Sequence, residues 1–144
     1  MSRVADICTA VVTGLNAHDF TEDFTAEKNY CDRPDVSEVS ALRVMVSPQA
    51  KVAEKATRTS FQEGVPIYVG IVKKLPNRET ATVEAMLQLV EDIGDLFKDQ
   101  ALATDPRAVF VGLESDAWYD EQMLQESAVF FSIITLIFQQ VVET

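Results

Sequence analysis

Val129-Phe-Phe-Ser-Ile-Ile-Thr-Leu-Ile-Phe138 is apolar throughout except for one serine and one threonine. Its aromatic and β-branched side chains are typical of a β-strand. Side chains alternate between the two faces of a strand. One face is therefore expected to carry Val129, Phe131, Ile133 and Ile137, and the other Phe130, Ile134, Leu136 and Phe138. Both faces are apolar and need cover. Helices of this chain can cover one; more sheet from this chain, or a neighbouring subunit, must cover the other.

Two segments show the 3.6-residue apolar period of an amphipathic helix. The first spans residues 3–15 and is expected to fray and stop at Gly14 and Asn16. The second, residues 79–98, has the clearest apolar stripe of the chain, and Asn77 or Thr80 is its expected cap. Either helix has the apolar face needed to lie on a sheet.

Five segments are predicted strands because they are rich in alternating apolar residues. They are residues 20–30, 42–46, 65–72, 108–113 and 129–138. Pro48 is expected to stop the second strand, and Pro66 to lie near the start of the third. The polar segment 49–63 is either an exposed strand pair or an extended arm. Residues 114–126 are expected to form a loop.

The order of these segments predicts an α+β fold, a mainly antiparallel sheet with two helices packed on one face. At 144 residues the chain is expected to form one domain, residues 1–144. The N-terminal residues lack the pattern of a signal peptide, and the C-terminal apolar run is too short for a membrane helix. A soluble protein of a reducing compartment is expected, with Cys8 on the apolar face of the first helix and a disulfide to Cys31 disfavoured.

The net charge of −11 disfavours binding to nucleic acid and to anionic membranes. The charge is uneven along the chain. Residues 1–38 carry 8 acids and 3 bases, residues 39–78 carry 2 acids and 7 bases, and residues 79–144 carry 13 acids and 2 bases. The basic middle either neutralises the acidic flanks of its own chain or meets the acidic flank of an identical neighbour.

The sequence predicts no catalytic, cofactor-binding or metal-binding residues. The chain has one histidine, His18, and Cys8 and Cys31 lack the companions of a zinc site. No GxSxG elbow, GxGxxG loop or Walker loop is present. We therefore expect a protein that is not an enzyme.

Acidic and aromatic residues gather at Asp116, Trp118, Tyr119, Asp120 and Glu121. Such groups bind sugars or hold the acid/base pair of a glycosidase, but they are also common in solvated loops of acidic proteins. The solvated loop is favoured. For the two aromatic residues, anchoring in the core is favoured over a role as contact hot spots.

Lys51, Lys55 and Arg58 give the polar segment 49–63 its positive charge. They lack the interleaved aromatic residues of a platform for single-stranded nucleic acid. Either a salt contact between subunits or plain solvation is expected. These three residues and the five of the acidic-aromatic group are the candidate interface residues.

The order of elements and the ending resemble the small tail-terminator or tail-completion proteins of tailed bacteriophages. The resemblance rests on the segment Tyr119-Asp-Glu-Gln-Met-Leu-Gln-Glu126 running into the apolar strand 129–138, after one long helix and a β region with a polar excursion. It covers most of the chain as a layout and about twenty residues as a sequence pattern. Segment 49–63 matches least well.

The resemblance implies a structural virion protein with no enzyme activity and no cofactor. It implies a ring, expected to be a hexamer, that caps the tail tube and then docks to the head connector. The implied partners are the protein itself, the tail tube protein and the head-tail connector, with DNA passing the ring without specific binding. The implied location is the virion neck, and the host cytoplasm during assembly. The alternatives are another neck or head-completion ring, or a small cytoplasmic homodimeric binding or adaptor domain.

Overall fold

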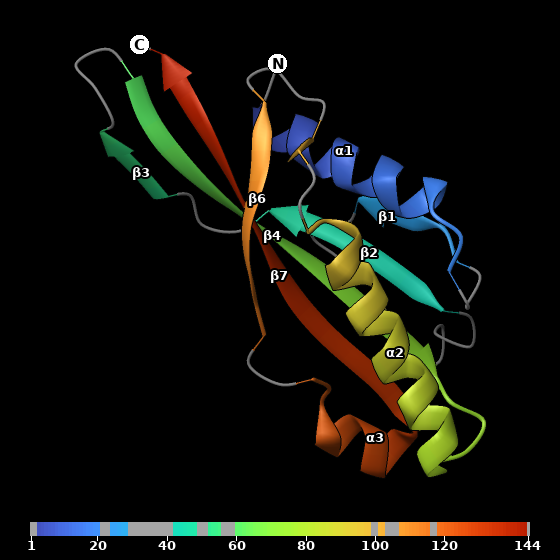
Figure 1. The fold of residues 1–144 in the computed structure, drawn as a ribbon. Helices are drawn as coiled ribbons and strands as arrows, with labels where there is room; N and C mark the ends of the chain where they lie inside the picture. Colours follow the sequence, from blue (N-terminus) through green and yellow to red (C-terminus); the bar gives the residue numbers. More distant parts are fainter. Residues whose placement is uncertain are drawn as a thin grey trace.

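The structure, a computed structural model, describes residues 3–20, 24–28, 42–48, 52–55, 60–98, 101–102, 107–115 and 118–143. The helices are α1 (Arg3–Ala17), α2 (Thr80–Leu96) and α3 (Glu121–Ser127). The strands are β1 (Ala26–Lys28), β2 (Arg43–Pro48), β3 (Val52–Lys55), β4 (Ser60–Lys74), β5 (Ala101–Leu102), β6 (Ala108–Glu114) and β7 (Val129–Glu143). They form one sheet in the order β1-β2-β4-β7-β6-β5, with β3 also pairing with β4 (Figure 1). Among the described pairs only β1 and β2 run parallel, so the fold is α+β with a mainly antiparallel sheet.

The centre of the sheet is the antiparallel pair of β4 and β7, which runs from Ser60 opposite Glu143 to Lys74 opposite Val129. The predicted division of β7 into two faces is confirmed. Its even-numbered residues from Phe130 to Gln140 are all buried. They lie opposite the buried odd-numbered residues Val65 to Ile71 of β4. We call this side of the sheet the covered face and the other side the open face.

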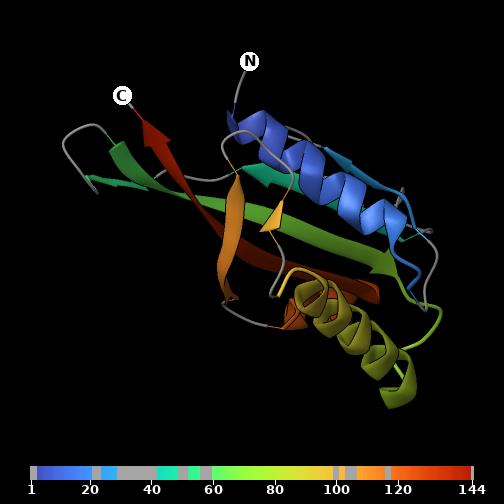
Figure 2. The same cartoon turned by 45° about the horizontal axis from the view of Figure 1, so that its top comes forward.

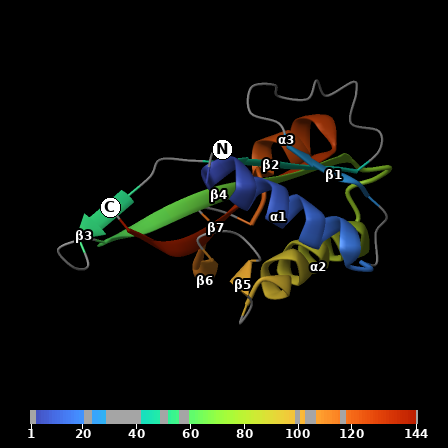
Figure 3. The same cartoon turned by 90° about the horizontal axis from the view of Figure 1, so that it is seen from above.

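Helices α1 and α2 both lie on the covered face, as predicted (Figures 2 and 3). Gly14 does not end α1, which continues to Ala17. The glycine instead faces α2, because a Cβ atom at this position would lie 3.3 Å from Cε1 of Phe97. The ring of Phe97 also stands edge-on to Phe138, with ring centroids 6.1 Å apart. Phe97 therefore joins both helices to the sheet.

The first predicted strand, residues 20–30, is too long. Within the described residues only Ala26–Lys28 is strand, and Phe20 and Phe24 stack on each other at 5.3 Å instead. On the side of β1 away from β2, the Asn16 side chain takes the place of a second neighbouring strand for Ala26. Its amide donates to the Ala26 carbonyl at 3.2 Å, and its Oδ1 accepts from the Ala26 backbone N–H at 2.7 Å. These two bonds attach the edge of the sheet to the end of α1.

The third strand is longer than predicted, so Pro66 lies inside β4 rather than near its start. The other side of β4 explains how a proline fits there. The pairing of β2 ends at Pro48 opposite Ile67, and that of β3 begins at Val52 opposite Gly64. On this side of β4, Pro66 therefore lies in the gap between the residues paired with β3 and those paired with β2. Its missing N–H removes no hydrogen bond to either strand. Pro48 is itself the last residue of β2.

The predicted loop 114–126 contains a helix, α3, which the sequence pattern did not indicate. Met123 of this helix packs with Val72 and Val129, both buried on the open face. Figure 3 shows α3 on the opposite side of the sheet from α1 and α2. One end of the open face therefore has a short helical cover of its own.

Asn77 is the side chain that organises the start of α2. Its Oδ1 accepts from the Glu79 backbone N–H at 3.0 Å and from the Thr82 hydroxyl at 2.8 Å. Glu79 holds the N-cap position without a side-chain bond of its own. Of the two expected caps, Asn77 therefore contributes from the preceding turn, and Thr80 is the first helical residue. None of the helices in the described ranges is long and apolar enough to span a membrane.

Candidate interaction site

Beyond α3 the open face has apolar side chains with little cover from the described chain. Ile133 is 39% exposed and Val141 is 53% exposed on β7, and Val109, opposite Gln139 on β6, is 47% exposed. Ile137 lies between them on the same face and is half-buried. The open face therefore presents β-branched side chains along β7, interrupted by Gln139. Exposed apolar stretches of this kind are typical of surfaces that bind another macromolecule.

A shallow hollow of about 370 Å³ interrupts the open face next to these side chains. Its lining is largely aromatic and polar: Tyr68, Glu114, Ser115, Tyr119, Asp120, Phe131, Ile133 and Thr135. Ser115 donates a long hydrogen bond of 3.4 Å to the carbonyl of Ile133, and the Asp120 backbone N–H donates to the carbonyl of Phe131 at 2.8 Å. These bonds hold Ser115, just after β6, and Asp120, just before α3, against β7.

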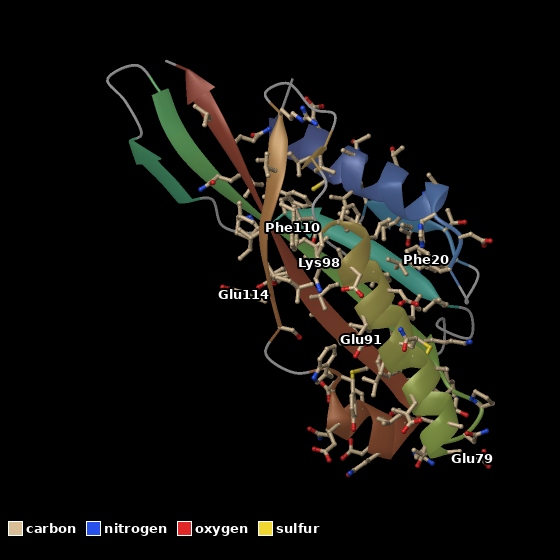
Figure 4. The ribbon with its side chains drawn as sticks, viewed as in Figure 1. Phe20, Glu79, Glu91, Lys98, Phe110 and Glu114 are labelled. Carbon is tan, nitrogen blue, oxygen red and sulfur yellow. The ribbon has the colours of Figure 1, made fainter. Side chains whose placement is uncertain are left out.

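A larger groove of about 720 Å³ opens between α2 and β6. Its lining residues are Val90, Glu91, Gly94, Asp95, Lys98, Leu113, Ser115, Trp118 and Ile134. We call it the Trp118 groove. Gly94 shapes it, because a Cβ atom there would lie 2.7 Å from Cδ1 of Leu113. Figure 4 shows Glu91 on α2, Lys98 in the turn after it and Glu114 at the end of β6.

The rim of the Trp118 groove is charged and its floor is apolar. Glu91 and Asp95 are exposed, and Lys98 lies 2.7 Å from Asp95 in an ion pair. Leu113 is 41% exposed and Trp118 is 56% exposed, so two large apolar side chains meet solvent beside these acids. An aromatic face with carboxylates next to it suits a basic side chain, which gains from both the ring and the charges.

Trp118 and Tyr119 differ in burial, although the sequence suggested the same role for both. Tyr119 packs against the core and stacks on Phe130, with ring centroids 5.8 Å apart. The predicted anchoring is therefore confirmed for Tyr119. It is wrong for Trp118, which is mostly exposed. The two residues lie in a bend just before α3, and there only the Tyr119 ring reaches the core.

The acidic members of the group have mostly structural explanations. Asp120 is the N-cap of α3, and its Oδ1 accepts from the Met123 backbone N–H at 3.0 Å. Glu121 is exposed in the first turn of α3, where a negative charge is favourable. Asp116 lies outside the described residues. Asp120 thus has a structural task that accounts for its place beside the two aromatic residues.

The described part of the polar segment 49–63 is a strand pair. β3 pairs antiparallel with residues 61–64 of β4, and the same end of β4 pairs with the last residues of β7. We call β3, residues 60–64 and residues 139–143 the arm. Figures 1 and 3 show the arm projecting beyond α1 and α2. Lys55 is the last residue of β3, while Lys51 and Arg58 lie outside the described residues.

Metal ligands do not gather anywhere in the ranges that the structure describes: no group of three or more His, Cys, Asp or Glu side chains could hold an ion there. His18 stands edge-on to Phe20, with ring centroids 4.5 Å apart. Cys8 is buried in the core under α1, and Cys31 lies outside the described residues. The open face and the Trp118 groove are thus the features that point to binding, and the exposure of Trp118 is the part that sequence reasoning missed.

Comparison with known proteins gives no relative from which a role for these surfaces could be transferred, since neither a protein-family model nor a curated protein matches the chain.

Proposed function

We propose that this protein is a non-enzymatic structural subunit of a bacteriophage neck, which forms a ring that caps the tail tube and joins it to the head connector. The observation that carries the proposal is the open face. Ile133, Val109 and Val141 remain exposed there after the chain has packed its own helices. A second copy of the chain, or a neighbouring virion protein, is the natural cover for such a surface.

A ring needs each subunit to offer different surfaces to its two neighbours. This chain has such surfaces, because the arm, the open face and the Trp118 groove belong to different parts of the sheet. A head-to-tail contact between two of them continues from subunit to subunit and closes into a ring. A hexamer is the number that the resemblance to tail-terminator proteins implies.

The order of elements supports the link to tail terminators. A first helix, strands with a polar excursion, one long helix and a long C-terminal strand follow one another as in the layout that carries the resemblance. The arm lies at the polar excursion. The acidic net charge of −11 suits a ring through which DNA passes without binding, because phosphates are repelled by it. The protein would work in the virion and assemble in the host cytoplasm.

The open face also fits a second candidate, a homodimeric binding or adaptor domain that pairs through its sheet. A dimer of this kind is isologous, with the same surface used on both sides, and it closes at two copies. Another neck or head-completion ring uses the same head-to-tail logic at a different level of the virion. Stoichiometry separates the dimer from the rings, and the binding partner separates the rings from one another.

The test is the mass of the assembled particle, measured by size-exclusion chromatography with light scattering and by electron microscopy. We expect rings, either alone or at the ends of tail tubes assembled from the tube protein encoded beside this gene. Ile133→Lys should prevent assembly because it places a charge in the open face. Ala85→Lys, at an exposed position of α2, is the matched control and should assemble normally.

A chain that stays monomeric at high concentration and leaves tail tubes uncapped would contradict the proposal. A dimer disrupted by Ile133→Lys would favour the adaptor domain instead. Rings that bind a portal or connector but leave tube length unregulated would move the protein to another layer of the neck. The circular dichroism spectrum of each variant should match that of the wild type, which shows that the fold is retained.

A further inference from the structure

We propose that neighbouring subunits join by pairing the outer edge of β3 in one copy of this chain with the outer edge of β7 in the next, so that the sheet of the arm continues from copy to copy. The inference rests on the proposed ring and names the two strands that meet in it. The arm extends past α1 and α2 (Figures 1 and 3). Its strands lie in the order β3, β4, β7, so β3 and the last residues of β7 are its two edges.

The last residues of β7 have a partner strand on one side only. On that side β4 pairs with β7 as far as Glu143, opposite Ser60. On the other side the described pairing with β6 ends at Gln139, opposite Val109. Residues 140–143 therefore form an edge to which no strand in the described ranges is paired.

The backbone groups of this edge point outwards. The carbonyl of Phe131 accepts from the Asp120 N–H at 2.8 Å, so it points away from β4. Successive residues of a strand direct their N–H and C=O groups to alternate sides. The register of β7 with β4 is regular over its whole length, so the alternation continues to the end of the strand. Val141 and Glu143 therefore present their N–H and C=O groups on the side away from β4.

β3 offers the same groups on the opposite side of the arm. The even-numbered residues of β4 lie opposite the odd-numbered residues of β7, so their N–H and C=O groups face β3 instead. Val52 and Glu54 lie opposite Gly64 and Gln62 and complete that ladder. The N–H and C=O groups of residues 53 and 55 therefore point away from β4. Each edge of the arm thus offers two residues whose backbone can pair with a further strand.

The other edges of the described sheet are poorly suited to a further strand. The Asn16 side chain bonds to Ala26 along the outer side of β1. β6 pairs with the two-residue β5 at one end and has a bulge at Val111 next to it. Bulges and covered edges prevent strand addition, whereas a regular open edge is a template for it. The two ladders of the arm have no bulge, so the arm is where strand addition is expected.

A second copy of this chain is the partner that fits both edges. β3 and β7 are each antiparallel to β4, so they run in the same direction. Copies in a head-to-tail contact keep a similar orientation, and β3 of one copy then lies parallel to β7 of the next. Each copy gives one edge and receives the other, so no edge stays open inside the ring. A strand from a different protein would fill one edge of each arm and leave the other exposed.

Proline substitution tests each edge separately, because proline has no N–H. Val141→Pro and Ala53→Pro each remove one outward N–H and no bond to β4. Each variant should stay monomeric under conditions in which the wild type assembles, as measured by light scattering. Val141→Thr and Ala53→Ser keep the N–H and are the matched controls, which should assemble normally. Circular dichroism of each proline variant should match that of the wild type.

Mixing the two proline variants identifies which edges meet. The Val141→Pro chain keeps its β3 edge, and the Ala53→Pro chain keeps its β7 edge. An equal mixture should therefore form one contact and stop at a particle with twice the mass of one chain. The same mixture made with Val141→Thr and Ala53→Ser should continue to the full particle.

Oxidative cross-linking tests the contact without proline. The parallel register that places β3 beside the open residues 141–143 puts Ala53 opposite Val142. Ala53→Cys with Val142→Cys, in a chain with Cys8→Ala and Cys31→Ser, should give a ladder of covalent multimers up to the mass of the full particle. Ala53→Cys with Ala85→Cys, at an exposed position of α2, is the control and should give no ladder.

Each contrary outcome has a distinct meaning. If both proline variants form the full particle, the arm is not the contact and the inference fails, but the proposed ring stands. If only one of them fails to assemble, that edge pairs with its own copy, and the pairing of β3 with β7 is wrong. A mixture that stays monomeric, or an assembled cysteine variant without the ladder, also overturns the inference. A wild-type chain that is monomeric at every concentration, with tail tubes present or absent, overturns both proposals.

Discussion

Ala128 forms the joint between α3 and β7, and replacing it by glycine should stabilise the protein. It is the only non-glycine residue with positive φ in the described ranges, with φ 52° and ψ 35°. Its N–H donates to the carbonyl of Leu124 at 3.1 Å, and its own carbonyl accepts from the Leu75 N–H at 2.7 Å. These bonds keep Ala128 in the left-handed conformation that glycine prefers at a helix C-terminus.

The expected gain is the difference between two opposing effects. The left-handed conformation costs an ordinary L-residue about 1–2 kcal/mol. Glycine removes that cost but loses about 0.5–1 kcal/mol through the greater freedom of its unfolded chain. Ala128→Gly should therefore raise the free energy of unfolding by about 0.5–1 kcal/mol. In a domain of this size, each kcal/mol of added stability raises the melting temperature by roughly 2–4 °C.

Urea denaturation followed by circular dichroism measures this change, with all variants at one protein concentration so that assembly contributes equally. Ala85→Gly is the control, since the exposed interior of α2 should lose about 1 kcal/mol from the same substitution. Ala128→Val should destabilise, because a branched Cβ is poorly tolerated at positive φ. If Ala128→Gly is no more stable than the wild type, α3 does not end in the way described and its place on the open face is in doubt.

Substitutions at three further positions test individual side-chain contacts by the same denaturation assay. Ser132 is buried on the covered face, and its hydroxyl has no hydrogen-bond partner among the described residues. Ser132→Ala should therefore raise the free energy of unfolding by about 1 kcal/mol. A loss of stability would mean that the hydroxyl is bonded. Asn16→Ala removes both bonds to Ala26 and should cost about 1–3 kcal/mol, while Asn16→Asp keeps the acceptor and should cost less; equal losses would show that the donor carries the effect. Asp120→Ala removes the cap on the Met123 N–H and should cost about 1 kcal/mol, whereas Asp120→Ser, which keeps a capping oxygen, should retain most of it.

The parts of the fold that the sequence predicted well are those with long apolar periods. The two faces of β7 and the apolar stripe of α2 each rest on a pattern repeated over many residues. One residue that departs from the pattern therefore does not change the prediction. The short elements were harder. α3 has only Met123 and Leu124 as apolar residues, too few for a period, although Asp120 before a run of good helix formers was a usable capping signal.

The candidate site divided in a way that sequence order could not show. Trp118 and Tyr119 are adjacent and chemically similar, but one ring packs against the core and the other meets solvent. The Trp118 groove depends on Gly94 and Leu113, which come from different elements and meet only when α2 packs across β6. A tertiary arrangement of this kind leaves no local pattern.

The long pairing of β4 with β7 also determines when the protein can fold. Ser60 pairs with Glu143 and Lys74 pairs with Val129, so the central ladder joins segments that are far apart in the chain. β6 has no central neighbour until β7 arrives beside it. Sheets dominated by such distant pairings fold slowly, because a large loop must close before the contacts that reward it can form. During synthesis the apolar β4 must therefore remain without its main partner until the C-terminal strand has left the ribosome, which makes the nascent chain dependent on protection from aggregation.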